Sequence, residues 1–185
     1  MRFPTLILAL GASVLIATGC ARDKEPAQNA VTAAETALNQ VRPQAQQFAP
    51  EHLKTVEGEL ATMKENLARE EYRAVLEDAK TFNADVTALN DAVVSKQTQI
   101  AAATHEWEQL SAEVPKSLQE IERQIGNMKG KKAESAKTEL ESMKAMWQEA
   151  AAAFTAGDAA AATDKGRAVQ EKAKAAREQL GMTPA

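Results

Sequence analysis

Cysteine, aromatic residues and long apolar runs are all scarce in this chain of 185 residues. Cys20 is the only cysteine, so no intramolecular disulfide can form and stability must come from packing. Aromatic residues make up 4% of the chain, and the longest apolar stretch, at 6–17, has twelve residues. Because a membrane-spanning helix needs about 20 apolar residues, this run is too short to cross a bilayer.

A basic face for nucleic acid is also missing. The chain has 22 Lys and Arg against 26 Asp and Glu, a net charge of −4, and loss of residues 1–19 with Arg2 would leave −5. Nucleic-acid-binding domains usually concentrate positive charge on one face. The sequence therefore predicts no nucleic-acid partner.

Motifs for catalysis or cofactor binding do not occur. There is no glycine-rich phosphate loop, nucleophile elbow or dinucleotide fingerprint. His52 and His105 have Ala49 and Ala102 three residues before them, so the Glu-x-x-His pair of di-metal bundles is missing. The cluster "HEWE" at 105–108 fits a solvated helix face better than a metal site. We expect no enzyme activity, no catalytic residue, no metal and no other cofactor.

The amino terminus carries a secretion pattern. Arg2 supplies a positive charge, the apolar run at 6–17 follows, and "ATG" at 17–19 adds small residues. A basic start, a short apolar stretch and small residues are typical of a secretory signal peptide. Residues 1–19 are therefore predicted to be a signal peptide, with Cys20 directly after it.

The junction "ATGC" resembles the lipobox of bacterial lipoproteins, in which an aliphatic and two small residues precede a cysteine. The resemblance implies that the Cys20 thiol, a nucleophile once deprotonated, receives a diacylglycerol and that acyl chains such as palmitate anchor the mature chain. Ala21 stands where an aspartate retains enteric lipoproteins in the inner membrane, which implies the outer membrane, facing the periplasm. A plain signal peptide and a short uncut anchor stay open as alternatives.

Apolar residues repeat every three or four positions along most of the remaining chain. A mean period of 3.5 is typical of helical bundles and coiled coils, and no stretch alternates as a strand would. The sequence predicts an all-α protein: an elongated antiparallel bundle of coiled-coil-like hairpins over residues 27–182, after a lipidated tether at 20–26. The main apolar positions are Ala27, Val31, Ala34, Leu38, Val41, Ala45, Phe48, Leu53, Val56, Leu60, Met63, Leu67, Tyr72, Val75, Ala79, Phe82, Val86, Leu89, Val93, Ile100, Ala103, Trp107, Leu110, Val114, Leu118, Ile121, Ile125, Met128, Ala133, Ala136, Leu140, Met143, Trp147, Ala150, Phe154, Ala162, Val169, Ala173, Ala176 and Leu180.

Proline residues mark expected breaks between helices. Pro43 and Pro50 bracket a first connection, and Pro50 suits the first position of the next helix. Pro115 predicts an interruption of the long third pattern. Ser117 and Glu120 then have the spacing of a capping box, so a new helix is expected to begin there.

Two glycines predict further helix ends. Gly130 within "KGKK" can end a helix in the left-handed conformation. Gly157–Asp158 is the sharpest turn signal, because glycine can end one helix and aspartate can accept amide hydrogen bonds at the start of the next.

An internal repeat relates the two halves of the pattern. "ELATMK" at 59–64 matches "ELESMK" at 139–144, and the alignment places Gly157–Asp158 on Glu70–Glu71. A turn is therefore predicted near residues 69–71. We expect repeat-like hairpins at about 50–95 and 131–180, within a bundle of five or six helices.

The first hairpin resembles a group of bacterial envelope lipoproteins with a helical-hairpin domain of unknown function. The resemblance rests on "APEHL" at 49–53 and "EEYRAVLEDA" at 70–79, with an echo in "GDAAAA" at 157–162. It implies an envelope location and a helical hairpin, but neither an activity nor site residues.

The expected function is that of a non-enzymatic, membrane-anchored lipoprotein of the cell envelope, acting as a structural protein or as an adaptor for a protein partner or for self-association. A periplasmic holdase would use an exposed groove at Met143, Met146 and Trp147, with Met63 a further methionine of this kind. A cell-wall glycan binder would expose Trp107 or Trp147 as a stacking platform. The pattern favours core positions for most of these side chains.

Overall fold

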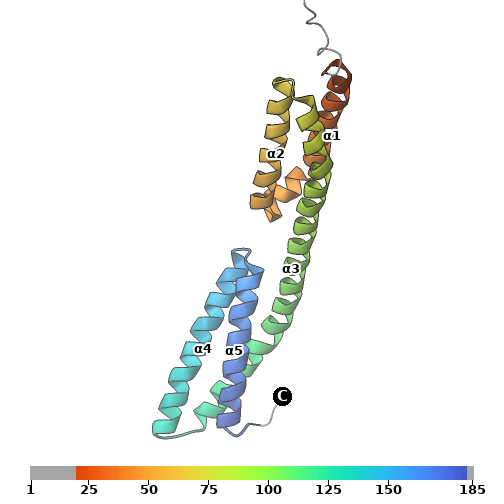
Figure 1. Ribbon diagram of the computed structural model, residues 1–185. Helices are drawn as coiled ribbons and strands as arrows, with labels where there is room; N and C mark the ends of the chain where they lie inside the picture. Colours follow the sequence, from red (N-terminus) through yellow and green to blue (C-terminus); the bar gives the residue numbers. More distant parts are fainter. Residues whose placement is uncertain (1–19, 183–185) are drawn as a thin grey trace, which may run out of the picture. The chain divides into compact units, whose positions relative to one another are not determined.

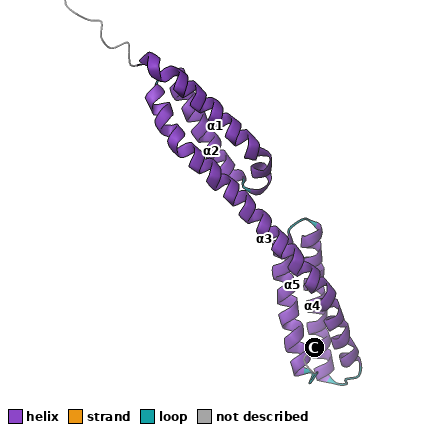
Figure 2. Cartoon of the chain, turned by 90° about the vertical axis from the view of Figure 1, so that its right-hand side faces the viewer, coloured by secondary structure: helices purple, strands orange, loops and turns teal. Residues whose placement is uncertain are grey.

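The computed structural model describes residues 20–182, and the predicted signal peptide at 1–19 lies outside them (Figure 1). Helices make up almost all of the described chain, and no strand occurs in it (Figure 2). The predicted all-α class is therefore confirmed. The helices are α1 (Cys20–Phe48), α2 (Pro50–Ala68), α3 (Tyr72–Gly126), α4 (Lys131–Thr155) and α5 (Ala159–Gln179).

The chain divides into two compact units, with the boundary inside α3 after Val94. Unit 1 contains α1, α2 and residues 72–94 of α3, whereas unit 2 contains residues 95–126 of α3 together with α4 and α5. Each unit thus has one helix followed by a helical hairpin. This common order is the one that the internal repeat would produce.

Unit 1 has one apolar core, which runs along the facing sides of its three helices. Spacings of three and four residues place apolar side chains on one face of each helix, so the faces meet and exclude water. Leu38, Met63 and Phe82, one from each helix, are at most 2% exposed. The buried core residues are Ala27, Val31, Ala34, Leu38, Ala45, Leu53, Val56, Leu60, Met63, Tyr72, Val75, Phe82, Val86, Leu89 and Val93.

Unit 2 buries two apolar clusters, both of which contact Trp147. The larger has Leu110, Val114, Leu118, Ile121, Ile125, Leu140, Met143, Val169, Ala173 and Ala176, and the smaller has Trp107, Ala150 and Ala162. Most of the predicted apolar positions are thus buried or packed against a core. Ile100 is instead 37% exposed, because residues 94–106 of α3 contribute to neither core.

The two predicted hairpin turns are confirmed, and they share one geometry. Glu70 and Gly157 both have positive φ, at 61° and 88°. In each turn an amide bonds to a carbonyl five residues earlier, from Glu71 to Asn66 and from Asp158 to Ala153. The Asp158 carboxylate also accepts a 2.9 Å hydrogen bond from the Ala161 amide, which caps α5 as expected.

The first connection is shorter than predicted. Pro50 is the first residue of α2, as expected, but α1 continues through Pro43 to Phe48 and only Ala49 separates the helices. The prediction that Pro43 marks a break is therefore wrong. Ala45, two residues after this proline, is fully buried, so the core favours continuation of the helix.

The break predicted at Pro115 is also wrong, because α3 passes through it without interruption. Val114 and Leu118 on either side are buried, and this burial offsets the hydrogen bond that proline cannot donate. Ser117 and Glu120 therefore lie inside the helix and form no capping box. Glu120 pairs instead with Arg177 of α5.

Gly130 has the positive φ that was predicted, at 82°, but at the other side of the connection. The preceding helix ends earlier, at Gly126, and Gly130 is the residue immediately before α4. The prediction that Gly130 ends a helix is therefore wrong. Residues 127–130 form a short connection instead, with Lys129 inside it.

Candidate functional site

Cys20, the predicted lipidation site, is the first residue of α1. Residues 20–26, expected as a tether, are helical, and Asp23 lies 3.6 Å from Arg73 of α3. Ala27, one residue further on, is fully buried in unit 1. Seven helical residues span only about 10 Å, so an anchor at Cys20 would lie close to a folded core. Within residues 20–182, no helix combines the length and apolarity needed to cross a membrane.

The two tryptophans considered as a glycan platform belong to an aromatic stack inside unit 2, as the favoured core positions predict. Trp107 stacks on Trp147 at 4.9 Å between ring centroids and on Phe154 at 5.2 Å, with interplanar angles of 13° and 18°. Trp107 is only 7% exposed. Stacking at these separations is the arrangement of aromatic side chains in a core, so the Trp107 ring is occupied by protein contacts.

Gly166 of α5 lies against this stack, and Thr163 comes three residues before it on the same helix. Both were absent from the predicted seam. A Cβ atom at Gly166 would lie 2.9 Å from Leu110 Cδ1 and 3.5 Å from Trp107 Cζ3, so the missing side chain lets α5 approach α3 closely. Thr163 is buried, and its hydroxyl contacts the carbonyl oxygens of Ala103 at 2.9 Å and Ala159 at 2.7 Å. Spacing alone could have identified Gly166, which lies four residues after Ala162.

The methionines considered for a client groove pack into the cores. Met63 is fully buried in unit 1 and Met143 is 3% exposed in unit 2. Met146 and Trp147 are partly buried and pack against the larger cluster of unit 2. These side chains therefore stabilise the bundle from inside.

The "HEWE" segment directs its polar residues to different partners. His105 Nδ1 lies 3.8 Å from Glu108 Oε2, and both side chains are at least 70% exposed. Glu106 pairs instead with Arg167 of α5, and the hydrogen bond from this guanidinium lowers the pKa of the Glu106 carboxyl. Within residues 20–182, no three His, Cys, Asp or Glu side chains cluster in a way that could hold a metal ion.

A small groove of unit 1, about 120 Å³ in volume, contains two carboxyl groups that sequence analysis missed. Glu59 of α2 and Asp85 of α3 both line it, together with His52. Burial raises the pKa of Glu59, and the nearby Asp85 carboxyl raises it further. Glu59 Oε2 is shielded from solvent and has no hydrogen-bond partner in the described chain. These surroundings favour the protonated form of the Glu59 carboxyl.

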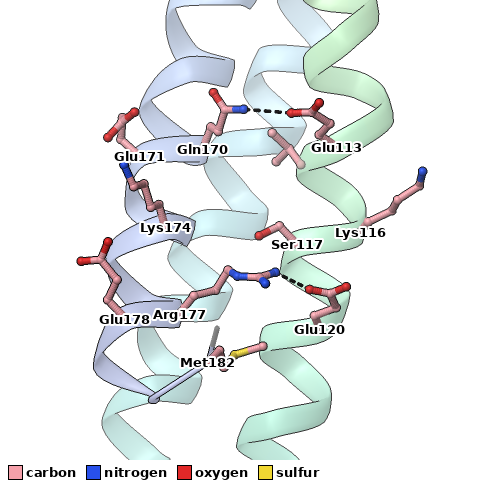
Figure 3. Close-up of a pocket in the computed structure, with 11 residues that line it drawn as sticks. Glu113, Lys116, Ser117, Glu120, Gln170, Glu171, Lys174, Arg177, Glu178 and Met182 are labelled. Atoms are coloured by element: carbon pink, nitrogen blue, oxygen red, sulfur yellow. Dashed lines mark hydrogen bonds and ion pairs between the residues drawn. The ribbon is translucent and has the colours of Figure 1, made fainter. Parts of the chain in front are cut away.

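A second, larger groove lies between α3 and α5 of unit 2 and has a volume of about 630 Å³ (Figure 3). Two polar contacts bridge the helices across it: Gln170 donates to Glu113 at 3.2 Å, and Arg177 pairs with Glu120. Cations and anions alternate along its walls, and Val114 and Met182 add apolar surface. The lining residues are Glu113, Val114, Lys116, Ser117, Glu120, Gln170, Glu171, Lys174, Arg177, Glu178 and Met182.

Comparisons with known proteins add no relative to this description. No family model, no curated protein and no solved structure matches the chain.

Proposed function

We propose that this chain is a non-enzymatic lipoprotein of the bacterial cell envelope, anchored through Cys20 and acting as a structural or protein-interaction adaptor. The observation that carries the proposal is the position of Cys20. The sole cysteine directly follows a basic start, a twelve-residue apolar run and three small residues. Two or three acyl chains anchor a protein far more firmly than a single chain does.

The start of α1 supports a short, stiff link between this anchor and the folded chain. Helical backbone begins at Cys20, the Asp23–Arg73 pair joins the first turns of α1 to α3, and Ala27 is already in the core. Unit 1 would therefore stay close to the membrane surface. Such a link suits a protein that must act near its membrane, as a spacer or an adaptor does.

Ion pairs between helices support a structural role for many of the charged residues. Lys144 of α4 pairs with Glu122 of α3 at 2.8 Å, and Lys165 of α5 pairs with Glu149 of α4 at 2.6 Å. These pairs lie at the surface of unit 2, where solvent and salt screen the attraction between the charges. The groove between α3 and α5 is the concave surface that we assign to a protein partner.

The anchor is tested by fractionating cells that express the full chain and measuring the intact mass of the membrane-bound protein. We expect a mass that starts at Cys20 and includes a diacylglycerol and an acyl chain. Cys20→Ser should abolish the lipid adduct and allow high salt to extract the protein from the membrane, whereas Ala21→Ser should keep the adduct. A mass that still includes residues 1–19, or membrane binding of Cys20→Ser that resists high salt as the parent does, would contradict the proposal.

The adaptor role is tested by photo-crosslinking in intact cells, with Cys20 unchanged. One probe replaces the exposed Gln148 of α4 and a second replaces the exposed Lys172 of α5, because Gln170 is already bonded to Glu113. A discrete protein adduct would establish an adaptor, and self-adducts or cell-wall adducts would establish a structural spacer. Absence of every adduct at both positions would count against both roles.

A further inference from the structure

One short segment of unit 2 reverses the charge of the chain around it. Residues 123–133, "RQIGNMKGKKA", contain four cations and no carboxylate. Because the whole chain has a net charge of −4, the residues outside this segment together carry −8. The cations are Arg123, Lys129, Lys131 and Lys132, and we call them the basic turn.

The fold brings these four side chains to one end of unit 2. Arg123 is in the last turn of α3, Lys129 is in the connection, and Lys131 and Lys132 begin α4. All four are exposed. None of them has an ion-pair partner in the described part of the chain, whereas nearby Lys137 and Lys144 are paired with glutamates.

The shape of the basic turn selects among anionic partners. Its lysines line neither of the two grooves described above, so they form an outward-facing surface rather than a binding cleft. The segment has no aromatic residue on which a nucleic-acid base could stack. An extended polyanion lying along unit 2 would also meet the acidic remainder of the chain.

A membrane surface avoids that repulsion. The 25 residues of α4 extend about 37 Å away from the basic turn. Charges separated by more than about 8 Å are largely screened at physiological ionic strength. A plane of lipid phosphates can therefore touch the end of unit 2 while most of its acidic residues stay beyond the screening distance.

We propose that the basic turn is a docking surface for anionic lipid headgroups, independent of any lipid on Cys20. Each lysine or arginine near an anionic bilayer contributes roughly fivefold to the affinity. The three lysines together should therefore contribute about a hundredfold. Salt should weaken the contact, because the attraction is electrostatic.

The test is a vesicle-binding titration with the full chain carrying Cys20→Ser, so that no acylated cysteine is present. Phosphatidylcholine vesicles containing phosphatidylglycerol are compared with phosphatidylcholine alone, which measures any contribution of residues 1–19. We expect tighter binding to the anionic vesicles, loss of that preference in high salt, and about a hundredfold weaker binding of K129Q/K131Q/K132Q.

The matched control is K116Q/K172Q/K174Q, which removes the same charge from exposed positions elsewhere on unit 2. We expect this control to change the binding only a few-fold. An equal loss of vesicle binding in both triple variants would show that only the net charge of the protein matters, and would overturn the proposal. Equal binding to neutral and anionic vesicles would overturn it too, as would equally tight binding of inorganic polyphosphate in solution.

Discussion

The size of residue 166 sets how closely α5 can approach α3. A Cβ atom at Gly166 would lie 2.9 Å from Leu110 Cδ1, inside a buried cluster. Gly166→Val should therefore destabilise unit 2 by about 1–3 kcal/mol, the usual cost of overpacking. Denaturant unfolding followed by tryptophan fluorescence measures this change.

Gly58 provides the opposite control. It lies inside α2 and is exposed, and apart from its chain neighbours and the backbone of its own helix no atom lies within 4 Å of the place where a Cβ would be. Gly58→Ala should stabilise unit 1 by roughly 0.8–1 kcal/mol through helix propensity alone. If Gly166→Val proved as harmless as Gly58→Ala, the close packing of α5 against α3 would be refuted.

The Glu59–Asp85 pair makes the stability of unit 1 depend on pH. The pKa of Glu59 is raised above its ordinary value of 4.5, first by burial and then by Asp85. The protonated carboxyl thus favours the folded state. The resulting stabilisation is present below pH 4.5 and is lost as the pH rises through the higher pKa of the folded protein.

Glu59→Gln should retain the neutral form at every pH. We expect unit 1 to gain less than about 1 kcal/mol at neutral pH, because solvent screens this partly exposed pair. The variant should also flatten the pH dependence just above pH 4.5, as measured by thermal unfolding. Asp91→Asn, at an exposed position of α3, should leave that dependence unchanged. A variant less stable than the parent at neutral pH would contradict the assignment.

Helix α3 contains a residue that locally destabilises it. Pro115 lies inside it and cannot donate the hydrogen bond that continues the helix. Pro115→Ala should stabilise unit 2 by up to about 3 kcal/mol, as seen by thermal unfolding. Pro50→Ala should be close to neutral, because Pro50 is the first residue of α2. A loss of stability in Pro115→Ala would mean that the fold requires the proline geometry.

Pro43 and Pro115 are the positions at which sequence-based prediction of the helices failed. The 3.5-residue period is visible directly in the chain, so most of the buried positions and the turn near residue 70 could be predicted. The breaks could not, because the local cost of Pro115 is opposed by burial of Val114 and Leu118 against other helices. Helix propensity depends only on the local sequence, so it does not include the stabilisation that comes from packing against other helices.

Contacts between helices were harder still to predict. The Glu59–Asp85 pair depends on the register of α2 against α3, which no periodicity in the sequence encodes. Gly166 was missed for another reason: glycine contributes no apolar side chain to the pattern, although its lack of one allows the contact with Leu110. No sequence motif marks the groove between α3 and α5, so its position could not be predicted either.

For the whole molecule, the separate cores predict separate responses to mutation. Leu38 is fully buried among residues 27–93, and none of these residues belongs to the clusters of unit 2. Leu38→Ala should lower the free energy of unfolding of unit 1 by about 2–5 kcal/mol. Hydrogen exchange should accelerate in α1, α2 and the start of α3, while amides of α4 and α5 remain protected.

Leu140→Ala is the reciprocal control, since Leu140 is buried in the larger cluster of unit 2. It should accelerate exchange in α4, α5 and the end of α3, and leave α1 and α2 protected. Equal acceleration throughout the chain in either variant would show that both units unfold as one cooperative whole.

The distribution of aromatic side chains also gives each unit its own optical signal. Both tryptophans, Trp107 and Trp147, belong to unit 2, and the only tyrosine, Tyr72, belongs to the core of unit 1. Two indoles stacked at 4.9 Å should couple their electronic transitions and produce a paired circular-dichroism band. The tryptophan bands therefore report unit 2 and the tyrosine band reports unit 1, so an unmodified sample already carries a separate spectroscopic label in each half.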